Sequence, residues 1–302
     1  MAQAILAQVV AQGSKMACVT RGCYASLYAM RTRFSRGGLG GSWARLRRSP
    51  ATCPSRGCGG GLALPPCRLV IFDKDGTLLD DAKTWAPVIE QLAAATAPFV
   101  PSSRLFEVLG YDAGKRHFTA DSLFMTATNE EVVERIRADV SAAAADAVDR
   151  FIAELPPHNA VGVPLVPLRP MMLELRSVGA QVAVLTSDNR RFAEAFLQAN
   201  DVLDLVSASV CGDDGLAPKP SAAPVLALCE RTGVPPQEAA MVGDSAERDV
   251  GCGLAAGVGS AVGVTSGVSS AEELKRAGAH LVVPTVASVL GALRGRHTLA
   301  DP

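Results

Sequence analysis

The chain has 302 residues, of which 48% are hydrophobic and 20% charged, so it is long enough to bury one or two sizeable cores. No window reaches the roughly 18 uninterrupted apolar residues of a transmembrane helix, so we expect no membrane partner. The formal net charge of −1 hides an asymmetry, because residues 1–67 contain no acid while the remainder holds all 30 acidic residues against 20 basic ones. This acidic body argues against a nucleic-acid partner, since neutralising phosphates requires a basic face.

The first 67 residues form a basic leader with Lys15 and eight arginines among Ala, Gly and Ser. Such an acid-free segment is similar to an organelle transit peptide. We expect residues 1–67 to be disordered and removed in an organelle. Arginine outnumbers serine, which favours the mitochondrial matrix over the plastid. A disordered basic tail on a cytoplasmic protein remains the alternative.

The apolar run CRLVIF (67–72) predicts a buried parallel strand that ends at charged residues. Helical patterns then take over, in 84–97, in 102–110 and in one long helix over 129–155 that opens with Asn129 as its cap. No strand is expected in this region. The Pro-rich stretch 156–167 predicts a hinge or boundary.

Strand and helix patterns alternate from there to the end of the chain. The expected strands are 181–186, 205–210, 239–243, 259–264 and 280–283, with helices between them. This alternation predicts an α/β protein with a doubly wound parallel sheet. We therefore divide the chain into a core of residues 68–83 and 166–302 and an inserted, all-helical domain of residues 84–165.

Polar residues follow the strands, at the edge where ligands bind in open parallel sheets. Asp73 and Asp75 follow the first strand, Thr186 ends the second, and Asp244 follows a later one. Asp249 comes five positions after Asp244, and Lys219 lies on the loop GLAPKPSAAP. Carboxylates gathered at one edge favour a hard cation such as Mg²⁺. Thr186 and Lys219 suit a phosphate, as hydrogen-bond donor and positive charge.

Four segments occur in a family-specific order: FDKDGTLLD, VLTSD, the Lys219–Pro220 loop and GDSAERD. In this the chain resembles phosphatases of the haloacid dehalogenase (HAD) superfamily, over about residues 68–295. The insertion is similar to the helical cap of the phosphoglycolate-phosphatase-like branch. The chain departs from the pattern in its fourth motif, where the two acids are five positions apart and close relatives often use four.

The resemblance implies a mechanism for the strand-end residues. Asp73 attacks phosphorus and forms an aspartyl-phosphate, which splits one displacement into two. Asp75 protonates the leaving alcohol and then deprotonates the attacking water. Thr186 and Lys219 stabilise the equatorial oxygens of the transferred phosphoryl group.

The resemblance also implies a metal site formed by Asp73, Asp75, Asp244 and Asp249. Mg²⁺ is expected to contact Asp73, Asp244 and the backbone carbonyl of Asp75. Asp249 is expected to orient Lys219 or a metal-bound water. The substrate is then a small phosphate ester, while the oligomeric state is left open.

Two other functions of the same fold stay open, a phosphosugar mutase and a non-catalytic binding protein. Arg190 and Arg191 could contact an anionic part of a substrate, but we interpret them as solvated charges. Lys74 receives no role. The order D-K-x-G-T is similar to cation-pumping ATPases, yet those carry Thr where this chain has Asp75 and they need membrane helices.

Overall fold

The computed structural model describes residues 67–119 and 122–296. The expectations for the basic leader lie outside these residues. No helix within the described ranges is long and apolar enough to cross a membrane. The cysteines in the same ranges are Cys67, Cys211, Cys229 and Cys252, which are all free and buried.

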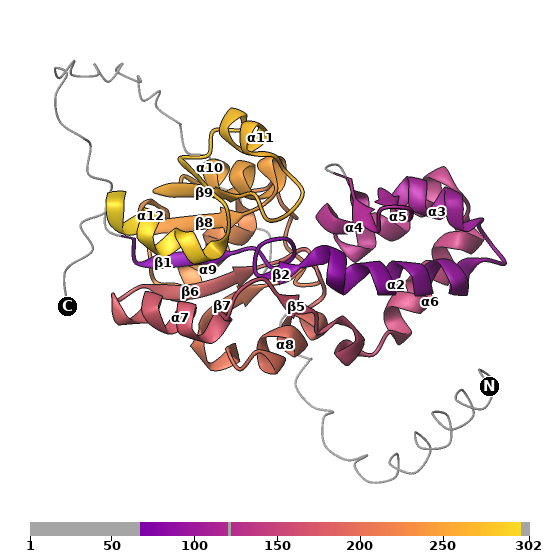
Figure 1. The fold of residues 1–302 in the computed structure, drawn as a ribbon, viewed down its shortest axis with the longest axis horizontal. Helices are drawn as coiled ribbons and strands as arrows, with labels where there is room; N and C mark the ends of the chain where they lie inside the picture. The colour runs from indigo at the N-terminus through magenta and orange to yellow at the C-terminus, as the bar shows by residue number, and fades with distance from the viewer. Residues whose placement is uncertain (1–66, 120–121, 297–302) are drawn as a thin grey trace, which may run out of the picture. The chain divides into compact units, whose positions relative to one another are not determined.

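A six-stranded parallel sheet forms the centre of the fold, in the order β10-β9-β8-β1-β6-β7 (Figure 1). Its strands are β1 (Leu69–Phe72), β6 (Gln181–Leu185), β7 (Val206–Val210), β8 (Ala239–Gly243), β9 (Ser260–Val264) and β10 (Leu281–Val283). All four residues of β1 are fully buried, as expected for a strand covered on both faces. The predicted α/β class is confirmed.

Helices pack on both faces because successive side chains of a strand point to opposite sides. Val70 and Phe72 share one apolar cluster with side chains of α7 (Leu168–Ser177), α8 (Arg190–Ala199) and α12 (Val289–Arg296). Leu69 and Ile71 belong to a second cluster with α9 (Ala223–Thr232), α10 (Gly251–Ala256) and α11 (Ala271–Arg276). The sheet is therefore doubly wound, as predicted.

The direction of winding reverses beside β1. The chain runs from β1 to β6 and β7 on one side, then returns to β8 on the other side and continues to β9 and β10. Ligands of open α/β sheets bind at the carboxyl ends of the strands next to such a reversal. Asp73 follows β1 and Asp244 follows β8, so both lie at this point.

Between the core segments lie the helices α2 (Asp81–Thr96), α3 (Ser102–Leu109), α4 (Leu123–Thr126), α5 (Asn129–Asp139) and α6 (Ala142–Glu154) (Figure 1). The expectation that this insertion is all-helical is wrong in one place. A short antiparallel hairpin joins β3 (Tyr111–Asp112) to β4 (His117–Phe118). Asp112 Oδ1 accepts hydrogen bonds from the backbone N–H groups of Gly114 and Lys115 in the turn. Strands of two residues are too short for a visible alternation.

The single long helix expected over 129–155 is also wrong, because two helices occupy this segment. Ser141 has extended backbone angles, and its Oγ accepts a hydrogen bond from Ala144 N at 3.1 Å, so it caps a new helix. The first cap also differs from the prediction. Thr128, rather than Asn129, forms a capping box with Glu131 at the start of α5.

The two connections between insertion and core run side by side. β2 (Leu79–Asp80) pairs antiparallel with β5 (Val163–Pro164), and Leu165 N donates to Leu78 O at 2.9 Å. That the Pro-rich stretch acts as a hinge stays a prediction. The remaining elements are the short turns η1 (Pro157–Ala160), η2 (Leu203–Leu205), η3 (Pro236–Glu238) and η5 (Val286–Ser288), and the π-helical turn η4 (Ala246–Val250).

Candidate active site

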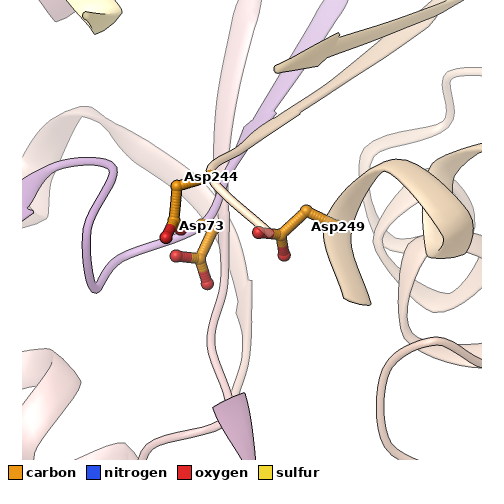
Figure 2. Close-up of side chains that lie close together, drawn as sticks. All are labelled: Asp73, Asp244 and Asp249. Atoms are coloured by element: carbon orange, nitrogen blue, oxygen red, sulfur yellow. The ribbon is translucent and has the colours of Figure 1, made fainter. Parts of the chain in front are cut away.

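Three buried carboxylates meet at the reversal point of the sheet. Asp73, Asp244 and Asp249 each offer an oxygen atom, and these atoms lie within 4.8 Å of one another. Figure 2 shows the three side chains turned toward a common space from the ends of two strands and from η4. Oxygen donors so arranged suit a hard divalent cation, and the structure brings together three of the four acids that the sequence suggested for a metal site.

The turn after β1 closes tightly around Asp244. Gly76 has φ +71°, and a Cβ atom there would lie 2.6 Å from Asp244 Oδ2, so the turn requires glycine for both reasons. Thr77 is fully buried and donates its Oγ1–H to Asp244 Oδ1 at 3.2 Å, while Val268 N donates to Oδ2 at 2.8 Å. Sequence reasoning missed this positioning role of Thr77, although the D-G-T order was visible.

Lys219 joins two of the carboxylates. Its Nζ donates to Asp73 Oδ1 at 2.6 Å and to Asp249 Oδ1 at 2.7 Å, with all three side chains buried. Burial alone lowers the pKa of Lys219, but the charges of Asp249 and Asp73 outweigh it and keep the pKa above its ordinary value. Lys219 is therefore a fixed positive charge beside Asp73, as the sequence predicted.

The positive charge of Lys219 does not fully offset the burial of the carboxylates and their mutual repulsion. Burial, with Asp249 and Asp75 nearby, raises the pKa of Asp73 to about 7 although Lys219 opposes the shift. Burial, with Asp73 and Asp249 nearby, raises the pKa of Asp244 well above its ordinary range. A divalent cation between these oxygens would relieve both, so the residues present fit the metal that the sequence predicts.

A π-helical turn brings Asp249 into the site. In η4 the N–H groups of Asp249 and Val250 both donate to Ser245 O, at 3.0 and 3.1 Å, so the turn holds one residue more than an α-helical turn. The acid five positions after Asp244 thereby reaches Lys219. Asp249 Oδ2 accepts from Ser245 N at 2.9 Å, so both of its oxygens are engaged.

Asp75 makes a different set of contacts from the other three acids. Its Oδ1 accepts a hydrogen bond from Lys74 Nζ at 2.9 Å and another from Trp85 Nε1 at 2.5 Å. Lys74 is fully buried, pairs with Asp188 at 3.0 Å, and lies 5.0 Å from the centre of the Trp85 ring. The interpretation of Lys74 as a residue without a role is therefore wrong. It is the charged centre of a buried network that holds Asp75.

Thr186 lies near the carboxylates without joining them. It is buried, and its Oγ1 accepts a hydrogen bond from Asp188 N at 3.1 Å. With Lys219 it lines a small cavity next to the one that holds Asp73 and Asp244. Its hydroxyl hydrogen has no acceptor among residues 67–119 and 122–296, so it can bind a ligand.

The two arginines after Thr186 are not open to an anion. Arg190 binds Asp214 through Nε and Nη2, at 3.1 and 2.7 Å. Arg191 donates to the carbonyls of Ile152 and Ala153 at the C-terminal end of α6. We had interpreted both as solvated charges. They are instead engaged in protein contacts, and Arg191 links α8 to the insertion.

The insertion also reaches the carboxylates. A cavity that we call the carboxylate pocket is lined by Asp73, Asp75, Met125, Thr126, Lys219, Asp244, Ser245, Arg248, Asp249 and Val268. Met125 and Thr126 come from α4, and Thr126 O accepts a hydrogen bond from Ser187 Oγ at 3.2 Å. Arg248 Nη1 donates to Glu131 of α5 at 3.2 Å and to Lys219 O at 3.0 Å. The insertion thus forms one wall of the pocket.

Comparison with known proteins places these features in context. Residues 67–257 match the family model described as haloacid dehalogenase-like hydrolase. The chain is 28% identical over 242 residues to the phosphoglycolate phosphatase of Escherichia coli (strain K12), covering 76% of this chain and 94% of that protein. It is 28% identical over 192 residues to the N-acetylmuramic acid 6-phosphate phosphatase of Pseudomonas aeruginosa, covering 63% and 78%.

Solved structures support the fold. A HAD phosphatase from Thermococcus onnurineus superposes with a TM-score of 0.54 at 24% identity, over 76% of this chain and 99% of the other. A HAD family hydrolase from Deinococcus radiodurans R1 gives a TM-score of 0.54 at 19% identity, over 78% and 99%. Both superpositions span nearly the whole of the solved chain and about three quarters of this one.

Proposed function

The chain belongs to the haloacid dehalogenase-like hydrolase family, and from that premise we propose that it is a Mg²⁺-dependent phosphatase of small phosphate monoesters. The observation that carries the proposal is the buried Lys219, held between Asp73 and Asp249 beside Asp244. The group combines a nucleophile, a fixed positive charge and oxygen ligands for a cation. Two relatives named as phosphatases of different esters support the reaction class rather than one substrate.

Asp73 is the proposed nucleophile. Its Oδ1 is held by Lys219, which leaves Oδ2 to attack phosphorus and form the aspartyl-phosphate. Lys219 reduces the repulsion between the attacking carboxylate and an anionic phosphate, and it faces charge that grows in the transition state. The Thr186 hydroxyl donates to another phosphate oxygen from the adjoining cavity.

Asp75 is the proposed acid and base. Lys74 and Trp85 both donate to Oδ1, so Oδ2 is the atom left to carry the transferred proton. Asp75 first protonates the leaving alkoxide and then takes a proton from the water that cleaves the aspartyl-phosphate. The donors on Oδ1 hold the carboxyl group in one orientation for both steps.

Mg²⁺ is the proposed cation because the ligands are hard oxygen atoms and the substrate is a phosphate. Asp73, Asp244 and the backbone carbonyl of Asp75 would hold it, and when bound it offsets negative charge on the phosphate and on the carboxylates. Asp249 acts through Lys219, since its own oxygens accept from Lys219 Nζ and Ser245 N. Thr77 and Val268 keep Asp244 in place.

The test is release of inorganic phosphate by the purified protein from a panel of phosphate monoesters, with Mg²⁺ and with a chelator. We expect multiple turnovers that need the metal and stop when it is removed. A phosphosugar mutase would convert sugar phosphates without net release of phosphate. A binding protein would show no turnover at all, and either result would overturn the proposal.

For residues 1–67 we propose targeting to an organelle, with the mitochondrial matrix as the destination. Support comes from the sequence alone, in the eight arginines and the lack of acids. The family match begins at residue 67, so nearly all of the basic leader lies outside it. A fluorescent protein fused after residue 67 should enter mitochondria. Diffuse cytoplasmic fluorescence would contradict the targeting proposal.

A further inference from the structure

A second cavity, which we call the apolar pocket, lies next to the carboxylate pocket. It measures about 50 Å³, more than the roughly 10–15 Å³ that one water molecule needs. Its wall is mostly aliphatic and aromatic, with side chains from α2, α4, α6 and α8 that include Trp85, Leu92, Phe124, Phe151, Ile152 and Phe192. Such a wall favours an apolar occupant.

The two cavities meet at Asp75 and Met125, which line both of them. Asp75 is the proposed donor of a proton to the leaving alcohol. A phosphoryl group between Asp73 and Lys219 would therefore have its ester oxygen near Asp75 and the rest of the alcohol beyond it. The apolar pocket begins at that position.

Charge in the apolar pocket disfavours an anionic occupant. The ionisable groups in its wall are the acids Asp75 and Asp188, and no lysine or arginine belongs to that wall in the described part of the chain. Lys74 does not belong to the wall and is already paired with both acids. Arg191 is bound to the end of α6. A carboxylate on the leaving group would lose its hydration in a mostly apolar wall and would find no free cation among the described residues there.

One polar group in the wall lacks a partner. Asn129 Nδ2 is buried, and no acceptor for its hydrogens lies among the residues that the structure describes. A buried N–H group without an acceptor is unfavourable, so an occupant that supplies one gains affinity. A neutral acceptor suits the site, because the described residues of the wall include no lysine or arginine to pair with an anion.

We propose that the apolar pocket binds the leaving alcohol and selects uncharged, largely apolar alcohols that carry one hydrogen-bond acceptor for Asn129. This rests on the proposed phosphatase function. It sets the substrate apart from glycolate, the anionic alcohol that the name of the Escherichia coli relative implies. The apolar pocket selects the leaving alcohol, while the carboxylate pocket carries out the phosphoryl transfer.

Three esters of nearly equal size and leaving-group acidity test the proposal: 4-oxopentyl phosphate, 4-methylpentyl phosphate and 3-carboxypropyl phosphate. They offer a neutral acceptor, an apolar group and an anion at the same position. We expect kcat/KM to be highest for the oxopentyl ester and lower by roughly tenfold or more for the carboxypropyl ester. A preference for the carboxypropyl ester, or equal values for all three, would overturn the inference.

Two variants test whether residues of the apolar pocket cause the preference among esters. Asn129→Leu should remove the advantage of the oxopentyl over the methylpentyl ester. Phe151→Ala should lower kcat/KM for the methylpentyl ester by roughly tenfold, and by less for methyl phosphate, which does not reach the apolar pocket. Phe99→Ala, on a side chain that is 49% exposed, is the matched control and should change neither ratio.

The outcomes separate this inference from the proposed function. Failure to release phosphate from any ester, including methyl phosphate and an aryl phosphate, would contradict the function itself. Release from all esters with ratios that Asn129→Leu and Phe151→Ala leave unchanged would contradict only the assignment of the apolar pocket. The comparison of the three esters on the unmodified protein needs no variant to fold.

Discussion

The carboxylate pocket and the apolar pocket share Asp75, yet the chain builds them in different ways. The acids and the lysine of the first come from motif segments that directly follow β1 and β8 or occupy one loop between them. The wall of the second is assembled from four helices that are far apart in the sequence. Reactive groups are thus held by the edge of a rigid sheet, and the groups that contact the leaving alcohol are held by helix faces.

This difference has a physical origin. Parallel strands fix the position of the residue at their ends, so charged atoms can be placed at hydrogen-bond distance from one another. An apolar wall needs only shape and hydrophobicity, which many side chains can supply. Chemistry and selection can therefore vary separately in this fold, and the following variants separate them.

Asp73→Asn should have the largest effect on activity. Loss of the nucleophile should lower kcat by roughly 10⁴–10⁶-fold for every ester alike, whatever its leaving alcohol. Asp149→Asn, a change at an exposed aspartate on α6, is the control and should keep full activity. If Asp73→Asn slowed some esters strongly and spared others, the carboxylate pocket would also be selecting substrates.

Lys74→Met should have the largest effect on stability, because Lys74 is a fully buried charge with two buried or partly buried acid partners. Removal of a buried charge that pairs with Asp75 and Asp188 is expected to lower the free energy of unfolding by about 3–5 kcal/mol. The loss should be smaller at pH 5 than at pH 8, since burial raises the pKa of Asp188, and without Lys74 this acid binds a proton more readily. Thermal unfolding measures it, with the exposed Lys275→Met as control. Equal free energies of unfolding for Lys74→Met and Lys275→Met would contradict the stabilising role of the ion pairs of Lys74.

Asp244→Asn should stabilise the metal-free protein while it removes activity. Burial raises the pKa of Asp244 above its ordinary value of 3.8, so the folded protein holds a proton that the unfolded chain releases. The stability of the unmodified protein therefore falls, because of this group, as pH rises from about 4 through the raised pKa. Asp244→Asn has no carboxyl group to titrate at this position, so its stability does not fall with pH for this reason.

The difference in Tm between Asp244→Asn and the unmodified protein should thus be near zero at pH 4 and positive at pH 7. Each kcal/mol corresponds to about 2–4 °C for a domain of this size. Added Mg²⁺ should raise the Tm of the unmodified protein and leave that of the variant unchanged. A difference that does not depend on pH would mean that Asp244 is not held at a raised pKa.

The smallest effect is expected at the ion pair between Arg248 of η4 and Glu131 of α5. The pair is partly exposed, so a double-mutant cycle with Arg248→Gln and Glu131→Gln should give a coupling below about 1 kcal/mol. Gln at 131 keeps the capping box of α5. The coupling should weaken with added salt. A coupling of several kcal/mol would show that this pair holds the insertion against the core.

Much of the carboxylate pocket could be predicted from the sequence, because each residue follows a recognisable strand. The apolar run before Asp73 and the run before Asp244 fix where these acids lie once the strands pair. Asp249 was expected beside Lys219 from the family resemblance, but the π-helical turn that brings it there leaves no periodic signal in the sequence. Thr77 belongs to the D-G-T segment of the first motif. Its hydrogen bond to Asp244 could not be predicted, because it joins residues that are far apart in the sequence.

The insertion could be predicted only as a helical region. Ser141 before an alanine-rich run is a helix-cap signal that contradicts one long helix. The β3–β4 hairpin is too short to show the alternation of apolar and polar residues that marks a strand. Lys74 received no role from the sequence. Its partners Trp85 and Asp188 come from a helix and from another strand end, so only tertiary packing shows that it is buried.

The division of labour between Asp73 and Asp75 is the central claim, and Asp75→Asn tests it most directly. The variant keeps the nucleophile and loses the proton donor, a contribution of roughly 10²–10⁴-fold. An aryl phosphate, whose phenolate leaves without a proton, should still phosphorylate Asp73. The aspartyl-phosphate should then persist, since its attacking water has lost the base.

The measurement is stopped-flow release of the phenol from an aryl phosphate by Asp75→Asn, with inorganic phosphate followed in parallel and the quenched protein examined by mass spectrometry. We predict a burst of phenol near one equivalent, little phosphate, and a phosphoryl group on Asp73. An alkyl phosphate should react far more slowly with the same variant. Equal losses for aryl and alkyl esters, with no burst and no phosphoryl group on Asp73, would contradict the account.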